Sequence, residues 1–461
     1  MFDPRKALTL SLSKGCQDRT TLGRRFDKLS VSAILASLLL TSSAVAQETG
    51  PLEVDVVGGV NAPMSIAVPV MPVAAGADAT LGRQVAEVIA SDLRSTGLFT
   101  PLGPNGIGGY SYDQAASPAY AEWRSAGAAQ LVSGYVEGRG DGKVTVGCYL
   151  HDVTAGRELT HNGFAVEAAD WRRAAHKCAD LVYSRLSGEQ AFLDTRIVYV
   201  AETGPKTNRV KRIALMDSDG ANHRYLTVGR TTVLTPRFSP NGQQLVYTTY
   251  IGRRPRVILL NTSTGAERLL IPGNLITFAP RFSPDGRNVV FSMANGGNTD
   301  LYVVSASGGE PHRLTTAPGA DTSASFSPDG RRIVFESDRS GTQQLYVMDA
   351  DGSGQQRISF GGGRYATPAW SPRGNLIAFT RIGGGFRIGI MNAGGGGEKL
   401  LSDAWQDEGP SWAPNGQFVM FHRTAQGSGT ATLYAVSING GPPRRLPTPV
   451  GGSDPSWSPL N

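Results

Sequence analysis

From about residue 195 onward, short apolar runs alternate with polar turns in a pattern that repeats. Each unit contains Pro-x-aromatic-Ser-Pro-Asp-Gly or a close variant, followed by an apolar run such as residues 289–291. Proline restricts φ in a tight turn and glycine tolerates a positive φ there, so the motif predicts a β-hairpin. The aromatic positions of the motif are 44, 44, 44, 42 and 45 residues apart: Phe238, Phe282, Phe326, Trp370, Trp412 and Trp457.

A second motif follows the first in each unit, as in residues 301–308 and 345–352, and it predicts two more strands. Four short strands per repeat of this length are typical of a β-propeller blade. The array opens on the second motif near Ile197 and closes on the first at residues 455–459. The sequence therefore predicts six blades, with the C-terminal strand completing the first one. An open array, the alternative, would leave sheet edges exposed.

Residues 47–193 lack this repeat and show a mixed pattern that predicts a small α/β domain before an all-β propeller at 194–461. Apolar residues from Leu81 to Leu93 share one helical face, and Gly97 would end that helix. A second helix is predicted over 168–186, ended by Gly188. Strands are predicted at 66–70, 129–135, 143–150 and 158–166.

Residues 1–46 have the pattern of a cleaved signal peptide: charged residues, an apolar run over 29–40, and small residues ending in Ala44-Val-Ala46. The apolar run is too short to span a bilayer, so we expect removal before Gln47 and no membrane insertion. Arg24 and Arg25 leave twin-arginine export open, although Phe26 follows them directly and favours the general secretory route. The unusually long charged region also leaves the start codon open.

The charge of the mature chain argues against nucleic-acid binding, and its cysteine content predicts a disulfide. The formal charge is +6, but the leader holds seven Lys/Arg against three Asp, so 6 − (7 − 3) leaves +2 and no basic run that predicts nucleic-acid binding. Cys16 lies in the leader, which leaves Cys148 and Cys178 as a predicted disulfide in an oxidising compartment. The alternative of two buried free thiols stays open.

The sequence shows no catalytic constellation. The six histidines, at 151, 161, 176, 223, 312 and 422, have no metal-ligand spacing, and no serine hydrolase elbow is present. Glycine-rich runs such as 394–397 lack the lysine of a phosphate-binding loop, and the repeated Asp residues suit turns. We therefore predict no enzyme activity, no cofactor and no metal. An exported propeller enzyme of the lactonase or dehydrogenase type is the alternative.

These features together resemble the TolB family, whose members are periplasmic propeller components of the Tol-Pal envelope system. The more specific similarities are Pro455-Ser-Trp-Ser-Pro459, Leu186-Ser-Gly188 before Thr195-Arg-Ile-Val-Tyr199, and Ala90-Ser-Asp-Leu-Arg94. The resemblance implies a monomeric periplasmic scaffold that supports outer-membrane invagination during division and envelope integrity. It also implies that the propeller mouth binds the lipoprotein Pal and that an N-terminal strand binds TolA.

The resemblance assigns residues to both partners. The TolA-binding strand corresponds to an alternating apolar and acidic segment: Leu52, Glu53, Val54, Asp55, Val56 and Val57. From the residues alone, an ordinary edge strand and a strand donated to a partner are both open. At the mouth, Thr322, Asp407 and Glu408 match family residues, whereas Leu234, Ile276, Ser323 and Tyr365 occupy Pal-contact positions with altered chemistry.

Overall fold

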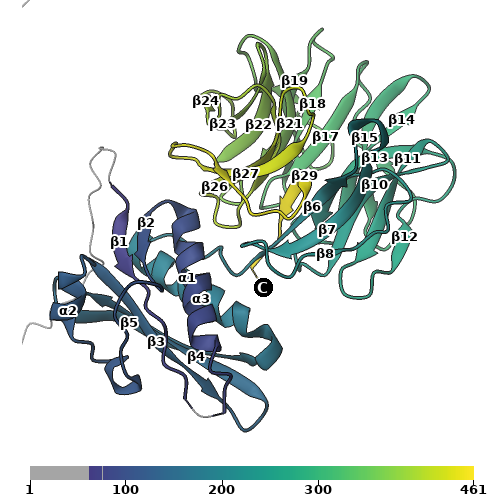
Figure 1. The fold of residues 1–461 in the computed structure, drawn as a ribbon. Helices are drawn as coiled ribbons and strands as arrows, with labels where there is room; N and C mark the ends of the chain where they lie inside the picture. Colours follow the sequence, from purple (N-terminus) through teal and green to yellow (C-terminus); the bar gives the residue numbers. More distant parts are fainter. Residues whose placement is uncertain (1–61, 75, 461) are drawn as a thin grey trace, which may run out of the picture. The chain divides into compact units, whose positions relative to one another are not determined.

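The computed structural model describes residues 62–74 and 76–460. The predicted leader and the strand at 52–57 lie outside the described residues. Figure 1 shows the two regions predicted from the sequence, an α/β domain followed by a β-propeller whose last strand lies beside its first ones. None of the helices in the described part of the chain combines the length and the apolar character that a membrane span requires.

The α/β domain is built on one five-stranded sheet in the order β2-β1-β3-β4-β5. Strand β1 pairs in parallel with both of its neighbours, β2 and β3, whereas β3, β4 and β5 form an antiparallel meander. The strands are β1 Met64–Ala67, β2 Phe99–Leu102, β3 Gln130–Gly138, β4 Lys143–Asp152 and β5 Arg157–Glu167. Strand β1 ends before the predicted residue 70, since Pro69 has no N–H to donate to the sheet.

Two long helices cover one face of this sheet, α1 (Leu81–Thr96) and α3 (Trp171–Ser187). Both end where predicted, at Gly97 and Gly188, which adopt the left-handed conformation with φ of 77° and 72°. The Cys148 side chain on β4 and the Cys178 side chain on α3 form a disulfide that fastens this helix to the sheet. Strand β2 and the short helix α2 (Tyr120–Ser125) were not predicted; on α2, Trp123 packs against Leu131.

The propeller consists of six four-stranded antiparallel sheets. Blade 1 contains β29 (Gly451–Trp457), β6 (Arg196–Thr203), β7 (Val210–Asp217) and β8 (Arg224–Tyr225). Blades 2 to 6 each contain four consecutive strands. Blade 2 contains β9 Val233–Phe238, β10 Gln244–Ile251, β11 Arg254–Asn261 and β12 Glu267–Leu269, and blade 3 contains β13 Ile276–Phe282, β14 Asn288–Asn295, β15 Asn298–Ser305 and β16 His312–Arg313. Blade 4 contains β17 Asp321–Phe326, β18 Arg332–Ser337, β19 Gln344–Asp349 and β20 Gln356–Arg357, and blade 5 contains β21 Arg364–Trp370, β22 Leu376–Ile382, β23 Phe386–Asn392 and β24 Lys399–Leu400. Blade 6 contains β25 Asp407–Trp412, β26 Phe418–Thr424, β27 Ala431–Ser437 and β28 Arg444–Arg445.

The innermost strands of the six blades form a closed ring. Strand β29 contacts β9 on one side and β25 on the other, and the remaining innermost strands contact one another in sequence order. The last strand therefore joins the first blade to the sixth, as the motif phase predicts, and no blade presents a free inner edge.

Equivalent positions in the blades carry equivalent side chains, which explains the sequence repeat. The fourth residue of each second strand is a buried aromatic ring that packs between blades: Tyr199, Tyr247, Phe291, Phe335, Phe379 and Phe421. In the turn before that strand, Asp285 accepts hydrogen bonds from Ser283 Oγ and from the Arg287 N–H, and Gly286 has a φ of 71°. The repeated Asp residues thus have the structural role expected of them.

Candidate functional site

Each innermost strand is interrupted by a bulge with one residue in the left-handed conformation. Five of these residues are not glycine and have φ between 48° and 56°, and the sixth is Gly409 with φ of 67°. The five are Thr235, Ala279, Ser323, Thr367 and Asp454. A positive φ in a β-branched or acidic residue is strained, so the surrounding structure must hold these bulges in place.

Side chains from neighbouring blades accept the N–H of most of these bulge residues. Thr248 Oγ1 accepts from Ala279 N at 3.1 Å, Glu336 Oε2 from Thr367 N at 2.6 Å, and Thr380 Oγ1 from Gly409 N at 3.3 Å. In blade 6, His422 Nδ1 lies 3.4 Å from the Asp454 N–H. Bonds between blades therefore fix the backbone at the bulges, within the innermost strands.

One end of the channel, called the mouth here, is where the innermost strands begin and where the second and third strands of each blade are joined. At Ile276, for example, β13 begins opposite Ala294, next to the β14–β15 hairpin. Large apolar side chains in these loops are unusually exposed: Phe360 is 75% exposed, Val228 73%, Trp405 60% and Ile251 47%. Apolar residues gathered on one face are typical of a surface that binds another protein.

Sequence reasoning missed these four rim residues, although a signal was present. Val228, Phe360 and Trp405 each stand in a loop just before an innermost strand, where solvent-facing polar residues are expected.

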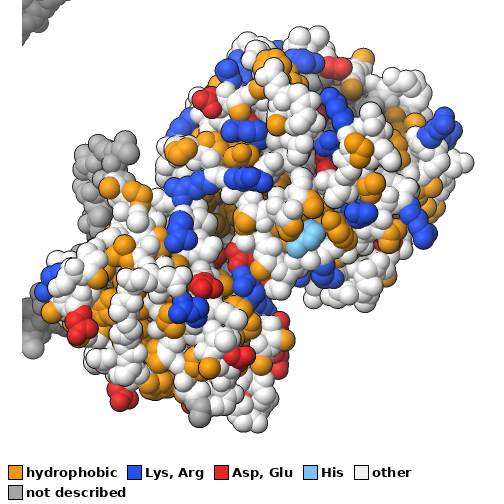
Figure 2. Space-filling view, viewed as in Figure 1, with side chains coloured by type: hydrophobic (Ala, Val, Ile, Leu, Met, Phe, Trp, Pro, Cys, Tyr) orange, Lys and Arg blue, Asp and Glu red, His pale blue; other side chains and the backbone are white. Residues whose placement is uncertain are grey.

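Figure 2 shows that Lys and Arg side chains on the visible face of the propeller are separated by uncharged surface, which gives no continuous basic track there.

The seven residues expected at the mouth differ in how accessible they are. Ile276 is 36% exposed, and Leu234, Thr322 and Ser323 are partly buried. The Thr322 and Ser323 hydroxyls both donate to the Glu336 carboxylate, so they help to hold the neighbouring bulge acceptor. These four residues lie on the innermost strands of three successive blades.

Tyr365 and Asp407 are instead fully buried. The Tyr365 hydroxyl donates to Glu398 and accepts from Arg381 Nη1, and burial together with that carboxylate raises the pKa of Tyr365 to about 12. Both carboxylate oxygens of Asp407 accept from the Arg423 guanidinium, at 2.7 and 2.9 Å. Their side chains can support the mouth, but neither reaches its surface.

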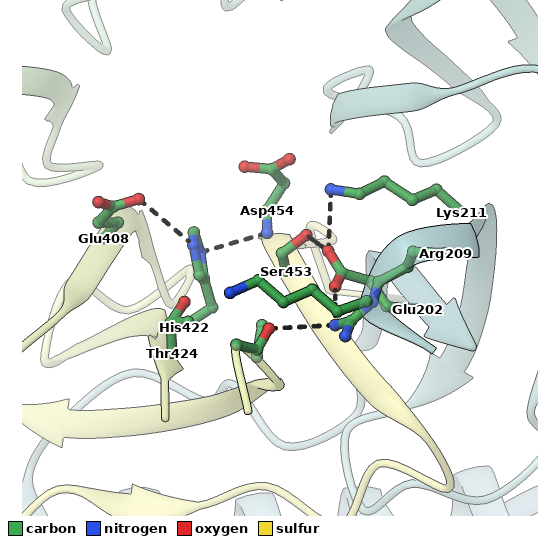
Figure 3. Close-up of a pocket in the computed structure, with 11 residues that line it drawn as sticks. Glu202, Arg209, Lys211, Glu408, His422, Thr424, Ser453 and Asp454 are labelled. Atoms are coloured by element: carbon green, nitrogen blue, oxygen red, sulfur yellow. Dashed lines mark hydrogen bonds and ion pairs between the residues drawn. The ribbon is translucent and has the colours of Figure 1, made fainter. Parts of the chain in front are cut away.

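Glu408 is the acidic residue of this set that does reach solvent, and it lines a pocket of 460 Å³. Figure 3 shows its carboxylate directed at His422, with Oε2 3.7 Å from Nε2. Burial alone would raise the pKa of Glu408, but its bond to His422 outweighs this and keeps the pKa below its ordinary value. The ionised form of Glu408 is therefore favoured at this wall of the pocket.

The opposite wall of the pocket comes from the β6–β7 hairpin. Glu202 accepts from Lys211 Nζ at 2.9 Å, from Arg209 Nη1 at 3.0 Å and from Ser453 Oγ at 2.8 Å (Figure 3). Burial raises the pKa of Glu202, yet the bonds from Lys211 and the other donors produce a net lowering. Arg209 also donates to the Gly429 carbonyl, which ties the hairpins of blades 1 and 6 together. The pocket is thus polar, rigid and charged on both walls.

A metal or cofactor would need another set of ligands. Among the described residues, one group of His and Asp side chains is close enough for a metal ion: Asp92, His176 and Asp219. Its charges are already balanced, because His176 Nδ1 lies 2.6 Å from Asp92 Oδ2 and Arg172 binds Asp219. His151 is buried and bonded to Ser133 and Tyr120, which is a structural role. His176 Nε2, by contrast, is buried and has no hydrogen-bond partner among the described residues.

Comparison with known proteins agrees with this architecture. Residues 52–159 match the family model described as the TolB amino-terminal domain, and residues 183–461 match the TolB beta propeller domain. The chain is similar to the Tol-Pal system protein TolB of Rhizorhabdus wittichii, with 65% identity over 93% of this chain and 98% of the relative. It is also similar to the protein of the same description from Zymomonas mobilis, with 63% identity over 89% of this chain and 91% of the relative. The crystal structure of TolB from Acinetobacter baumannii superimposes with a TM-score of 0.75 at 27% identity, covering 87% of this chain and 97% of that one.

Proposed function

Since the chain belongs to the TolB family and is a component of the Tol-Pal system, we propose that it is a periplasmic scaffold whose propeller mouth binds Pal and whose strand at 52–57 binds TolA. Through these two contacts it would link the partners and support outer-membrane invagination during division. The observation that carries the proposal is the exposed apolar rim beside a charged pocket at one end of the propeller. Exposed apolar side chains beside charged groups suit a protein partner.

The mouth assignment is tested by measuring Pal binding to purified protein by calorimetry. Trp405→Ala removes an exposed ring of the rim, and we expect affinity to fall by about tenfold or more, because truncating a buried interface aromatic has effects of this size. The matched control is Leu269→Ala, which removes an exposed apolar side chain from the outermost strand of blade 2. Equal affinity of the Trp405 variant and the unchanged protein would place Pal elsewhere.

Glu408→Lys tests the charged pocket separately. Of the two acidic residues expected at the mouth, Glu408 is the suitable one, since reversing the charge of Asp407 would leave two positive charges facing each other in a buried pair. We expect Glu408→Lys to weaken Pal binding, whereas Glu310→Lys, an exposed position between β15 and β16, should not. If both variants bind Pal as the unchanged protein does, the pocket takes no part.

The second contact is tested by deleting residues 52–57. β-augmentation requires the donated strand but not the mouth, so we expect TolA binding to be lost and Pal affinity to be nearly unchanged. The two sites would be coupled if the strand at 52–57 had two states, one packed on its own protein and one released to TolA, and if Pal bound these two states with different affinity. Retained TolA binding after the deletion would refute the strand assignment.

A further inference from the structure

Two arginines occupy equivalent positions on adjacent innermost strands of the propeller. Arg237 on β9 pairs with Val246, and Arg281 on β13 pairs with Val290, in the same place after each bulge. The other four blades carry small residues at this position: Ser325, Ala369, Ser411 and Ser456. At this position, long cationic side chains therefore stand only on the innermost strands of blades 2 and 3.

Serine at this position bonds to the next blade, whereas the longer Arg237 side chain reaches the preceding blade. Ser325 Oγ accepts the Trp370 N–H at 3.2 Å, and Ser411 Oγ accepts the Trp457 N–H at 3.3 Å, so each reaches toward the innermost strand of the next blade. Arg237 and Arg281 leave the backbone at the corresponding place. Both residues are partly buried.

The hydrogen bonds made by these two guanidinium groups are few. Arg237 donates to the Pro236 carbonyl at 2.8 Å and to the Pro455 carbonyl at 3.4 Å. The Arg281 guanidinium has no hydrogen bond or ion pair with any residue in the ranges 62–74 and 76–460, although its backbone belongs to the β13–β14 pair. Since a guanidinium has five N–H donors, most of the donor capacity of these two groups is unused.

Their charges are also poorly compensated. Burial and the positive charge of Arg237 together hold the pKa of Arg281 well below its usual range. Burial lowers the pKa of Arg237 as well, and the Asp454 carboxylate partly opposes this. Asp454 in turn accepts the Thr235 N–H, so part of its hydrogen-bonding capacity is already used. An added negative charge would relieve the repulsion between the two arginines.

We propose that Arg237 and Arg281 form a binding site for an oxyanion, a carboxylate or phosphate group, in the central channel of the propeller. Guanidinium groups bind these anions through paired N–H donors, and partial desolvation strengthens such bonds. The anion has two possible sources: a free ion, or an acidic side chain of a protein seated on the mouth. The second source rests on the proposed function, whereas the first does not.

The first arm of the test uses inorganic phosphate and the full mature chain. Thermal unfolding is followed at constant ionic strength with phosphate replacing chloride, because general screening must not change. We expect the midpoint to rise by about 2 °C or more in the unchanged protein and not in Arg281→Gln or Arg281→Ser. Arg287→Gln, at an exposed position at the far end of the same blade, should retain the rise.

The second arm measures Pal affinity for the same variants, and it separates the two sources. Weaker Pal binding by Arg281→Gln, with no stabilisation of the unchanged protein by phosphate, would identify a partner carboxylate as the ligand. Stabilisation by phosphate that depends on Arg281 would identify a free anion, whether or not Pal binds the mouth. If phosphate stabilises the Arg281 variants as much as the unchanged protein, or if it stabilises neither and Pal affinity is unaffected, the proposal is overturned.

Discussion

Single hydroxyl groups, those of Thr248 and Thr380, hold two of the propeller bulges, and the effect of removing one can be predicted from what it bonds. Thr248 is 2% exposed and accepts the Ala279 N–H, so Thr248→Val leaves a buried donor unsatisfied at nearly constant side-chain volume. We expect a loss of about 1–3 kcal/mol in the free energy of unfolding, measured by urea denaturation. Ser292 occupies the equivalent place in blade 3, but its buried hydroxyl has no partner among the described residues. Ser292→Ala should therefore cost less, and equal losses for the two variants would contradict this role.

The buried pair of His176 on α3 and Asp92 on α1 predicts a pH dependence of stability. Burial alone lowers the pKa of His176, but Asp92 outweighs it and raises the pKa to about 9, while burial raises the pKa of Asp92 to about 6. The pair is thus ionised at pH 7. The folded protein holds the His176 proton more tightly than the unfolded chain does. Protonated His176 therefore contributes fully to the free energy of unfolding below pH about 6.5, and this contribution is lost as the pH rises through about 9.

We expect the free energy of unfolding to fall by about 1–3 kcal/mol between pH 7 and pH 9.5 from this pair. Urea denaturation at both pH values measures it, with His176→Gln as the comparison. The variant should be less stable than the unchanged protein at pH 7 and should lose less on the way to pH 9.5. A variant that loses just as much would show that other groups cause the dependence.

For single residues, the sequence predicted the roles of turn residues better than it predicted which side chains are exposed at the mouth. The role of Asp285 follows from residues adjacent to it in the chain, so the local motif was sufficient. The partners of Tyr365 and Asp407 are Glu398, just before β24, and Arg423 on β26, which are distant in sequence, and no local motif reveals those contacts. The arginine pair was missed for the same reason, since its residues are one whole repeat apart.

Among the elements, β29 has the largest predicted effect on stability. It pairs with β6 in blade 1, and Trp457 joins it further by donating from Nε1 to Thr195 Oγ1 at 3.0 Å. A chain ending at Val450 would lack this strand and would expose the edge of β6 together with buried surface of blades 1 and 6. We expect aggregation or loss of most of the free energy of unfolding, measured by calorimetry and light scattering.

A chain ending at Pro459 is the matched control for this truncation. It keeps Ser458, whose Oγ accepts the Arg196 N–H at 2.8 Å, and should melt like the full chain. If the chain ending at Val450 also melts like the full chain, closure by β29 contributes little to stability.

The sequence could predict this closure because the two motifs repeat with a fixed phase. Strand β2 and helix α2 gave no such signal, since β2 has four residues and contains Pro101, and α2 has six.

For the whole molecule, export and oxidation are expected to act together. The predicted leader carries a net charge of +4, and its removal would leave the mature chain at +2, close to neutrality. In an oxidising compartment the Cys148–Cys178 bridge closes a loop with a sequence separation of 30, which contributes about 3–4 kcal/mol by restricting the unfolded chain. We expect the periplasmic protein to begin at or near Gln47 and to have the mass of the oxidised chain.

Intact-mass spectrometry of the periplasmic fraction, with alkylation before and after reduction, tests both parts of this prediction. The thiols should react only after reduction, and the Cys148→Ala, Cys178→Ala double variant should unfold at lower denaturant concentration. Cys178 lies on α3 with His176, so loosening this helix by reduction should also weaken the buried pair and reduce the stability lost between pH 7 and pH 9.5. Alkylation of both thiols without reductant would refute the bridge, and a mass that includes residues 1–46 would refute removal of the leader.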